Sequence, residues 1–342
     1  MRRSGAWVPG VGAAVPDSFR ALVAEQRDDD VARELRELSA EDLGEGDVVV
    51  RVGWSSVNYK DALAVSPKGR VAQISPLVPG VDLAGTVVSG DGEGEDVIVH
   101  GHDLGVAHHG GFAEYARVPG EWVIPLPAGL SARQAMALGT AGFTAGLSVQ
   151  RLEDHGVEPG DGPVLVLGAS GGVGSTAVGI LAARGFEIAA ATGKPDEADW
   201  LRELGASEIL SRDETSAESK KPMEKQRWAA VVDPVGGSSL AYALRTTRYG
   251  GAVAASGLTG GTSLETTVFP FILRAVSLLG VDSVNTPADV RLSVWERLAG
   301  DLRPRGLDES ITREVSLDDV DALLDDVLAG KGVGRTVVRV GG

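Results

Sequence analysis

The residues whose types and spacing could do chemistry are concentrated in one glycine-rich turn. The stretch "VLVLGASGGVGSTA" (164–177) places Gly168, Gly171 and Gly174 between an apolar strand pattern and a helical pattern. Glycine lets a backbone turn sharply and approach a pyrophosphate closely, and Gly174 would let the helix pack against the strand. The helix N-terminus would offer unpaired N–H groups and a positive dipole to the phosphates. The spacing therefore predicts a dinucleotide-binding turn.

Two other motifs share these letters, and the sequence argues against both. A P-loop requires Lys directly after its last glycine, and this chain has Ser175 there. The segment 168–172 also fits the nucleophile elbow of α/β-hydrolases, with Ser170 as the nucleophile. Those enzymes place an Asp and then a His after that serine in the chain. Here all five histidines come before it: His100, His102, His108, His109 and His155.

The strand after the turn ends in an unexpected residue type. A dinucleotide fold usually has Asp or Glu here, which accepts hydrogen bonds from the ribose of NAD and would repel the 2′-phosphate of NADP. In "EIAAATGKPDEADW" (187–200) the strand ends instead in Thr192, Gly193 and Lys194. A hydroxyl donor and a positive charge suit a dianionic group, so the sequence favours NADPH. The alternative is that Lys194 is a solvated loop residue.

These motifs need a scaffold of strands and helices, and the rest of the chain predicts one. From about residue 19 to 127, short β-branched runs separated by Gly, Pro and Asp predict a mostly β domain. A long helix is predicted from Ser131 as its N-cap, and apolar strands then alternate with helices. Six such strands predict a doubly wound parallel sheet of the α/β class. A last strand, "RTVVRV" (335–340), could rejoin the first domain.

Composition narrows the classes of function. The 342 residues are 43% hydrophobic and 23% charged, which is typical of a globular chain long enough for two domains. The net charge of −16 disfavours nucleic acid as a partner. Cysteine is absent, which excludes disulfides, thiol catalysis and Cys-ligated zinc and is compatible with the cytoplasm. No apolar run approaches the ~18 residues of a membrane span, and we expect residues 1–18 to be a flexible extension.

Seven motifs distributed over nearly the whole chain carry a resemblance to a known family. They are "WSSVNYKDALA" (54–64), "PGVDLAGTV" (79–87), "GTAGFTAGL" (139–147), "GASGGVGSTA" (168–177), "LGAS" (204–207), "PMEKQRWAAVVDPVGG" (222–237) and "TTVFPFILRAVSLLGVDSV" (266–284). As a set they resemble the zinc-free medium-chain reductases, and within them the acrylyl-CoA reductase branch with its quinone-oxidoreductase-like relatives. The resemblance implies a GroES-like, mostly β catalytic domain (1–133 and 284–342) and a six-stranded Rossmann domain (134–283).

The resemblance also implies a set of cofactor contacts, with NADPH as the cofactor and no metal. Carried over by position, they fall on Tyr59, Ser170, Gly171, Gly172, Val173, Thr192, Gly193, Lys194, Arg212, Leu258, Ile272, Ser283 and Arg335. Arg212 enters only in this way, as a second cation for the 2′-phosphate.

The "NYKD" run supplies the candidate catalytic residues, Asn58 and Tyr59. A tyrosine hydroxyl can donate a hydrogen bond to a developing oxyanion or to the nicotinamide ribose. The alternative is a core aromatic with a satisfied hydroxyl, and Asp61 is expected to be a structural cap.

Two polar runs are given non-catalytic interpretations. The four histidines of "HGHDLGVAHHGG" (100–111) are expected to form a polar lip over the active cleft, with His108 at the shared family position, rather than a metal site. The basic run "ESKKPMEKQRW" (218–228) is expected to be a solvated loop, with coenzyme A phosphates as the alternative ligand.

The resemblance implies an NADPH-dependent reductase that transfers hydride to the β-carbon of a 2-enoyl thioester, most concretely acrylyl-CoA to propionyl-CoA. The alternatives are an NADPH-dependent quinone or enone reductase and a non-catalytic NADPH-binding sensor. The apolar strand "AVSLLGVDSV" (275–284) at a sheet edge predicts pairing with its own copy, and hence a homodimer. A small-molecule substrate is expected, with no nucleic acid or membrane partner.

Overall fold

The computed structural model describes residues 15–341, which divide into two compact units. Unit 1 contains the described residues up to Thr140 together with those from Ile311 onward, and unit 2 contains Ala141–Ser310. Residues 1–14 of the predicted N-terminal extension lie outside the described residues.

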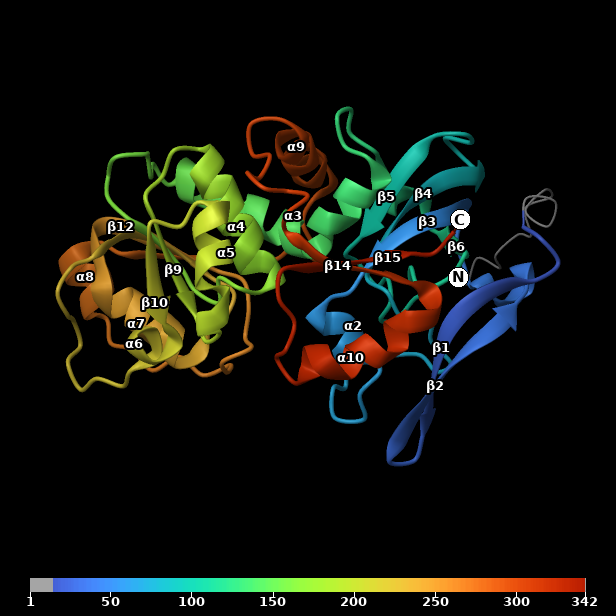
Figure 1. Ribbon diagram of the computed structural model, residues 1–342, viewed down its shortest axis with the longest axis horizontal. Helices are drawn as coiled ribbons and strands as arrows, with labels where there is room; N and C mark the ends of the chain where they lie inside the picture. The colour runs from blue at the N-terminus through green and yellow to red at the C-terminus, as the bar shows by residue number, and fades with distance from the viewer. Residues whose placement is uncertain (1–14, 342) are drawn as a thin grey trace, which may run out of the picture. The chain divides into compact units, whose positions relative to one another are not determined.

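Unit 1 is built on a seven-stranded sheet (Figure 1). The strand order is β14-β15-β3-β4-β5-β7, and β6 also pairs with β3. The strands are β3 (Val48–Ser56), β4 (Asp82–Ser89), β5 (Asp96–His100), β6 (Tyr115–Val118), β7 (Ile124–Pro125), β14 (Ile311–Ser316) and β15 (Arg335–Arg339). β15 lies antiparallel to β3, which confirms that the last strand rejoins the first part of the chain.

A two-stranded hairpin, β1 (Phe19–Arg27) and β2 (Asp30–Leu38), adds a second layer to unit 1. Alternate residues of β3 explain why both its faces are covered. Val48, Val50 and Val52 belong to one buried cluster, whereas Val49 belongs to a second cluster together with Phe19 of β1. Because side chains alternate across a strand, the valine-rich sequence of β3 serves both layers.

The helices of unit 1 are short. They are η1 (Ala40–Leu43), α2 (Tyr59–Ala64), η2 (Gly120–Trp122), η4 (Leu317–Asp319) and α10 (Val320–Leu328). α10 packs on α2, and Val320 and Leu324 share one buried cluster with Ala62. The C-terminal segment therefore contributes both a strand and a helix that support α2.

Unit 2 is built on a six-stranded parallel sheet in the order β10-β9-β8-β11-β12-β13 (Figure 1). The strands are β8 (Val164–Val166), β9 (Ile188–Thr192), β10 (Glu208–Ser211), β11 (Trp228–Asp233), β12 (Thr247–Ala255) and β13 (Ser277–Gly280). Every residue of β8, β9 and β11 is buried, so both faces of the central sheet are covered. The predicted α/β class with a doubly wound Rossmann sheet is confirmed.

The helices of unit 2 follow the strands in alternation, as predicted. They are α4 (Gly172–Ala183), η3 (Pro195–Glu197), α5 (Ala198–Leu204), α6 (Arg212–Ser216), α7 (Gly237–Thr246), α8 (Phe269–Arg274) and α9 (Ala288–Ala299). α4 packs with α5, and α6 packs with α7.

The long helix α3 (Ala132–Asp154) begins in unit 1 and ends in unit 2. The Ser131 hydroxyl accepts a hydrogen bond from the backbone N–H of Gln134 at 3.2 Å, which agrees with its predicted role as N-cap. The helix is broken at Gly139, whose φ of 51° and ψ of −156° are not helical. This break is absent from the predicted helix.

The two units divide the chain differently from the predicted domains over residues 134–140, which lie in unit 1, and over residues 284–310, which lie in unit 2. Residues 284–310 were predicted to belong to the β domain, but they, and α9 with them, lie within unit 2. Val294 and Leu298 of α9 are fully buried, and both lie against Gly146 of α3. The absence of a side chain at Gly146 makes room for this packing, because a Cβ there would lie 3.0 Å from Leu298 Cδ2.

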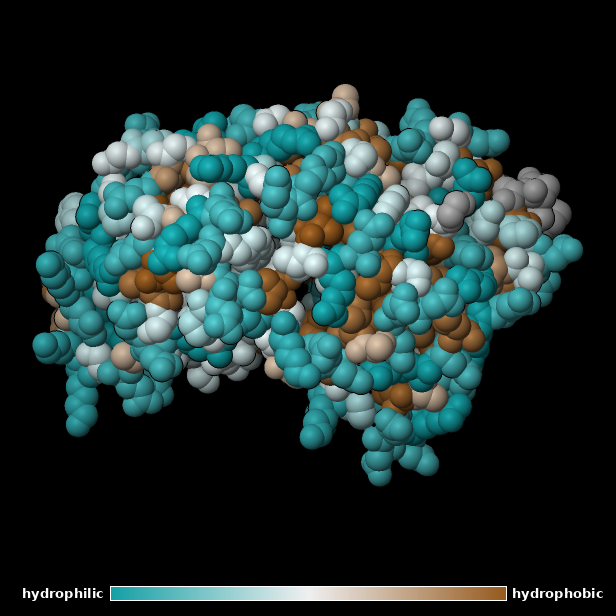
Figure 2. All heavy atoms as spheres, in the orientation of Figure 1, coloured by the Kyte–Doolittle hydropathy of each residue, from teal (hydrophilic) through white to brown (hydrophobic). Residues whose placement is uncertain are grey.

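Over residues 15–341, no helix is both long enough and apolar enough to cross a membrane. On the face seen in Figure 2, hydrophilic residues cover most of the surface, and apolar residues show in small separate groups.

Candidate nucleotide-binding and catalytic sites

The glycine-rich turn of unit 2 connects β8 to α4. Gly168 has a φ of 56°, a left-handed conformation that favours glycine. A Cβ on Gly174 would lie 2.3 Å from the carbonyl oxygen of Gly168, so the predicted close packing of helix and strand at Gly174 is confirmed. Gly171 is the N-cap of α4 and provides no side-chain cap. The first N–H groups of α4 therefore have no side chain bound to them and can receive the phosphates of a nucleotide.

The hydroxyls of Ser170 and Thr192 join the ends of two neighbouring strands. Their oxygen atoms are 2.8 Å apart, and both residues are buried. Thr192 Oγ1 also accepts a hydrogen bond from the backbone N–H of Lys194 at 3.0 Å. Thr192 therefore fixes the backbone from Thr192 to Lys194, besides the direct phosphate contact predicted for it.

Two cations lie close together at the end of β9. Lys194 follows the strand, and Arg212 is the first residue of α6. Partial burial lowers the pKa of Lys194, and nearby Arg212 lowers it further, while Glu197 opposes the shift. The guanidinium of Arg212 lies against the backbone of Gly193, since a Cβ there would be 2.5 Å from Arg212 Cζ. Two neighbouring cations in an acidic chain create a local positive potential, which is what an anion-binding site requires.

Three other predicted contacts lie on the connections around β12 and β13. Leu258 and Ser283 follow the carboxyl ends of these strands, where ligands bind in open α/β sheets. Ile272 lies on α8 between them, and its side chain and that of Leu258 are exposed.

Asp233 is a residue at this edge that motif spacing did not single out. It ends β11 and is buried, and its carboxylate accepts hydrogen bonds from the N–H groups of Val235 (2.8 Å) and Gly236 (3.0 Å). Burial raises the pKa of Asp233, and the two N–H groups oppose the shift. The signal that could have found it is the sequence "DPVGG" directly after an apolar strand.

The candidate catalytic residues lie at the start of α2 in unit 1. Tyr59 is the first helical residue and is 40% exposed. Asn58 is the N-cap, and its backbone N–H donates to Asp61 Oδ2 at 2.7 Å. Asp61 is therefore the structural cap that was predicted, and its Oδ1 also accepts from the N–H of Val81 at 2.7 Å. Burial, with the nearby carboxylate of Asp82, raises the pKa of Asp61 to about 7.

The carboxylate of Asp82 is the centre of a buried polar cluster beneath α2. It accepts hydrogen bonds from Ser56 Oγ (2.6 Å), Asn58 Nδ2 (2.7 Å) and Thr140 Oγ1 (2.6 Å). The guanidinium of Arg335 lies 3.9 Å away. The cluster joins β3, the cap of α2, β4, the broken region of α3 and β15.

Arg335 and Asn58 are both satisfied inside this cluster. Arg335 donates to the carbonyl oxygen of Ala137 (2.7 Å), to Ser56 Oγ (2.9 Å) and to Asn58 Oδ1 (3.2 Å). Asn58 and Arg335 are at most 9% exposed. The geometry gives both residues a supporting role beneath α2, whereas the catalytic contact of Asn58 and the cofactor contact of Arg335 stay predictions.

The histidine-rich loop packs around Trp122. His102 stacks on the indole at a centroid distance of 5.0 Å, and His108 meets its edge at 5.2 Å. His109 Nδ1 accepts the backbone N–H of Val78 at 3.1 Å. These contacts give the rings a packing role within unit 1.

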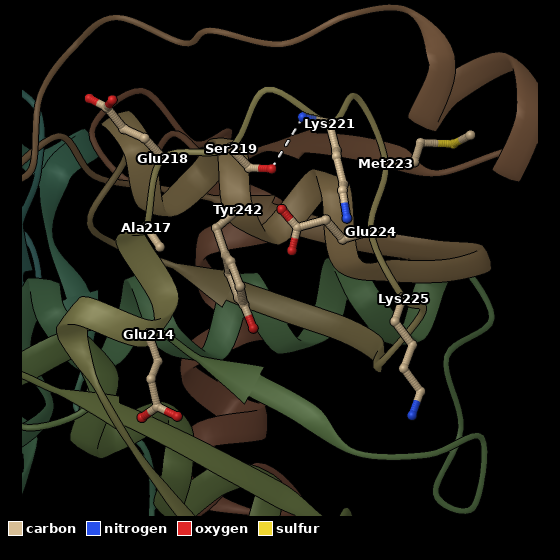
Figure 3. A pocket seen from close by; sticks show the side chains of 9 residues that line it. All are labelled: Glu214, Ala217, Glu218, Ser219, Lys221, Met223, Glu224, Lys225 and Tyr242. Atoms are coloured by element: carbon tan, nitrogen blue, oxygen red, sulfur yellow. Dashed lines mark hydrogen bonds between the residues drawn. The ribbon is translucent and has the colours of Figure 1, made fainter.

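The basic run lines a pocket of about 540 Å³ on unit 2 (Figure 3). Lys221 and Lys225 share its rim with Glu218 and Glu224, and Tyr242 lines it from α7. Glu224 is also paired with Arg245 at 3.2 Å. The mixed charges do not form a cationic surface for coenzyme A phosphates.

Two family models match separate parts of the chain, and the second begins within the glycine-rich turn. The model described as the alcohol dehydrogenase GroES-like domain matches residues 44–128, and the model described as zinc-binding dehydrogenase matches residues 172–300. The acrylyl-CoA reductase AcuI of Ruegeria pomeroyi is 49% identical over 328 residues, which cover 94% of this chain and 99% of that protein. The chain belongs to the medium-chain dehydrogenase/reductase family. It is thus a member of an oxidoreductase family, in the branch of AcuI and its quinone-oxidoreductase-like relatives.

Solved structures of other medium-chain reductases share the whole fold. The Bacillus subtilis protein YhfP with NAD bound has a TM-score of 0.92 and 49% identity, covering 95% of this chain and 100% of that chain. YhfP carries a name that assigns it provisionally to the quinone oxidoreductases. Escherichia coli K-12 YhdH with bound NADPH has a TM-score of 0.90 and 47% identity, covering 94% and 100%.

The residues of this medium-chain reductase do not fit the zinc in the name of the second family model. Within residues 15–341, no three His, Cys, Asp or Glu side chains come together in a group that could hold a metal ion. Cysteine, a common zinc ligand, is missing from the whole sequence.

Proposed function

We propose that the chain is an NADPH-dependent reductase that adds hydride to the β-carbon of a 2-enoyl thioester, most concretely converting acrylyl-CoA to propionyl-CoA. The main support for the substrate is the similarity to the acrylyl-CoA reductase AcuI, at 49% identity over 94% of the chain. The support for hydride chemistry is the glycine-rich turn between β8 and α4, which has the form of a dinucleotide site.

The observation that carries the choice of NADPH is the pair of cations at the end of β9, Lys194 and Arg212. A carboxylate at this position would repel a 2′-phosphate, and the segment 192–194 contains none. The relatives alone leave the choice open, because YhfP was crystallised with NAD and E. coli YhdH with NADPH. The positive charge of Lys194 and Arg212 is therefore the reason for proposing NADPH rather than NADH.

We assign residues of unit 2 to the phosphates of the nucleotide and a residue of unit 1 to the substrate. When bound, NADPH would supply the hydride for the β-carbon, and Tyr59, a ribose hydroxyl or water would supply the proton for the α-carbon. The N–H groups of the first turn of α4 would hold the pyrophosphate, and Lys194 and Arg212 would hold the 2′-phosphate. In unit 1, the hydroxyl of Tyr59, a residue that is 40% exposed, would donate a hydrogen bond to the thioester oxygen, where negative charge develops. The buried cluster around Asp82 would keep the first turn of α2 in position for this contact.

Two alternatives differ from this proposal in measurable ways. A quinone or enone reductase is favoured by the quinone-oxidoreductase name of YhfP. A non-catalytic NADPH-binding sensor would bind the nucleotide tightly without turnover.

The deciding experiment compares acrylyl-CoA, crotonyl-CoA and 1,4-benzoquinone as substrates, with NADPH oxidation followed by absorbance. The proposal expects the highest kcat/KM for acrylyl-CoA. It also expects Tyr59→Phe to lower kcat about 100- to 1,000-fold, because one stabilising donor is lost. A higher kcat/KM for benzoquinone would favour the quinone reductase, and binding without turnover of any substrate would favour the sensor.

We also propose that the protein is a cytoplasmic homodimer. β13 is an edge strand that pairs only with β12 among the described strands, and its Leu278 is 38% exposed. An apolar edge strand is an aggregation hazard unless another strand covers it, and a second copy of β13 could do so. The lack of cysteine is compatible with a reducing compartment.

A further inference from the structure

Gly193 lies between the two cations, and the space that its side chain would fill is occupied by Arg212. A Cβ built on Gly193 would lie 2.5 Å from both Cζ and Nη2 of Arg212 and 2.7 Å from its Nε. These distances are shorter than van der Waals contact, so the guanidinium lies directly on the glycine backbone. The φ of Gly193 is outside the left-handed region. The backbone therefore does not require a glycine here, whereas the position of Arg212 does.

Few other contacts fix the guanidinium of Arg212. Within the described part of the chain, it forms no hydrogen bond or ion pair, and the residue is exposed at the start of α6. The backbone of α6 is held by its N-cap, because Ser211 Oγ accepts the N–H of Glu214 at 3.2 Å. The backbone of Arg212 is thus fixed, whereas the position of its guanidinium depends on the absence of a side chain at Gly193.

The neighbouring cation is held separately. The backbone N–H of Lys194 donates to Thr192 Oγ1, which is itself tied to Ser170. A side chain on Gly193 would therefore displace Arg212 first, because the end of a flexible arginine moves more easily than a hydrogen-bonded backbone. We expect the Gly193 variant to fold, since the guanidinium of Arg212 that it displaces is on the surface.

We propose that Gly193 is a specificity-determining residue, which keeps Arg212 beside Lys194 so that both cations meet the 2′-phosphate of NADPH. The inference rests on the proposed NADPH dependence and adds a residue that makes no ionic contact itself. A side chain at this position would separate the two charges. The preference for NADPH over NADH would then fall about 10- to 100-fold, the value of a lost charge-assisted hydrogen bond.

The test is a double-mutant cycle with Gly193→Ala and Arg212→Ala. The dissociation constants of NADPH and NADH are measured for the wild type, both single variants and the double variant by isothermal titration calorimetry. The inference expects Gly193→Ala to weaken NADPH binding more than NADH binding, which lowers the ratio of the dissociation constant of NADH to that of NADPH. It also expects this ratio in the double variant to equal the ratio in Arg212→Ala alone. Gly332→Ala is the matched control, because a Cβ there would have no atom nearer than 3.9 Å, and it should leave the ratio unchanged.

The outcomes separate the inference from the proposed cofactor preference. If the wild type binds NADH as tightly as NADPH, the cofactor proposal fails, and the inference fails with it. If the wild type prefers NADPH and Gly193→Ala retains the full preference, only the inference is overturned. Only the inference is also overturned if Gly193→Ala lowers the preference for NADPH further in a protein that already carries Arg212→Ala. Circular dichroism spectra and melting temperatures of all variants establish that the fold is retained.

Discussion

The side-chain amide of Asn58 donates a hydrogen bond to the carboxylate of Asp82 at 2.7 Å. Asn58 caps the helix that begins with Tyr59, whereas Asp82 begins a strand of the sheet behind it. Through this contact the buried Asp82 holds Asn58 in place, and Asn58 directly precedes the partly exposed Tyr59. Asp82 therefore links the stability of unit 1 to the position of the first turn of α2.

Replacing Asp82 should destabilise the fold strongly. Asp82→Ala would leave the buried Arg335 without its carboxylate partner, and breaking a buried pair in this way costs about 3–5 kcal/mol. Urea denaturation followed by circular dichroism measures the loss. Asp318→Ala, which breaks an exposed ion pair with Arg20, should cost no more than about 1 kcal/mol. Equal losses in the two variants would contradict the assignment of Asp82 as the centre of the cluster.

The break in α3 should tolerate no side chain. Gly139→Ala would place a Cβ 2.4 Å from Asp82 Oδ2, on a backbone with a φ of 51°. Strain and displacement of the carboxylate together should lower the stability by more than about 1 kcal/mol. Thermal unfolding checks this value, and Gly332→Ala should change the stability by less than about 0.5 kcal/mol. A Gly139→Ala protein as stable as the wild type would show that the break is not required.

Asp61 should make the stability depend on pH. Burial raises its pKa to about 7 from 3.8, so between these values the folded protein holds a proton that the unfolded chain has lost. Stability conferred by this group is therefore present at low pH and is lost as the pH rises towards 7, by at most about 1.4 kcal/mol per pH unit.

The comparison that isolates Asp61 is wild type against Asp61→Asn between about pH 5 and about pH 7.5. The wild type should lose its stability advantage over the variant as the pH rises, as measured by urea denaturation. Asp301→Asn is a suitable control, because the hydrogen bond from Arg297 lowers the pKa of Asp301 and keeps it ionised throughout this range. A constant difference between wild type and Asp61→Asn would contradict the assignment.

Removing the charge of Lys194 should weaken NADPH selectively. Lys194→Ala would raise the KM for NADPH about 10- to 100-fold through the loss of a charge-assisted contact. The KM for NADH should rise much less, because NADH lacks the 2′-phosphate. Steady-state kinetics with both nucleotides provide the measurement, and Lys225→Ala in the mixed-charge pocket should have no such effect. Equal increases for the two nucleotides would remove the basis for the cofactor proposal.

A charge on the exposed edge strand should prevent dimer formation. Leu278→Lys introduces a cation on β13, which would face its own copy across the proposed interface. Light scattering at micromolar protein should give the mass of a dimer for the wild type and of a monomer for the variant. A monomeric wild type would refute the homodimer.

The sequence was most informative where local pattern and packing agree. Alternating strands and helices predicted the parallel sheet of unit 2, and the spacing of Gly168 and Gly174 predicted the turn and its close packing. Ser131 was correctly predicted as a helix cap. For the turn and the cap the signal lies within a few residues, and each strand and helix of unit 2 is marked by the pattern of its own residues, so the physical cause is local.

The buried cluster of unit 1 was not predicted, because its members come from distant parts of the chain. Asp82 and Arg335 approach each other only after β3, β4 and β15 pair. No local pattern marks a carboxylate as buried, so the supporting hydrogen bond from Asn58 to Asp82 was not predicted, and the catalytic contact of Asn58 stays a prediction. The break at Gly139 was missed for the same reason, since the carboxylate that occupies the space of its missing side chain belongs to Asp82 of β4.

The late position of β15 in the chain has a consequence for biosynthesis. A ribosome releases β3 long before β15, so the whole Rossmann unit emerges before β3 receives its antiparallel neighbour β15. The sheet of unit 1 is thus completed only after unit 2 has been translated. A nascent chain that stalls before residue 335 would have Asp82 without Arg335 and β3 without β15, and an unpaired strand edge favours aggregation.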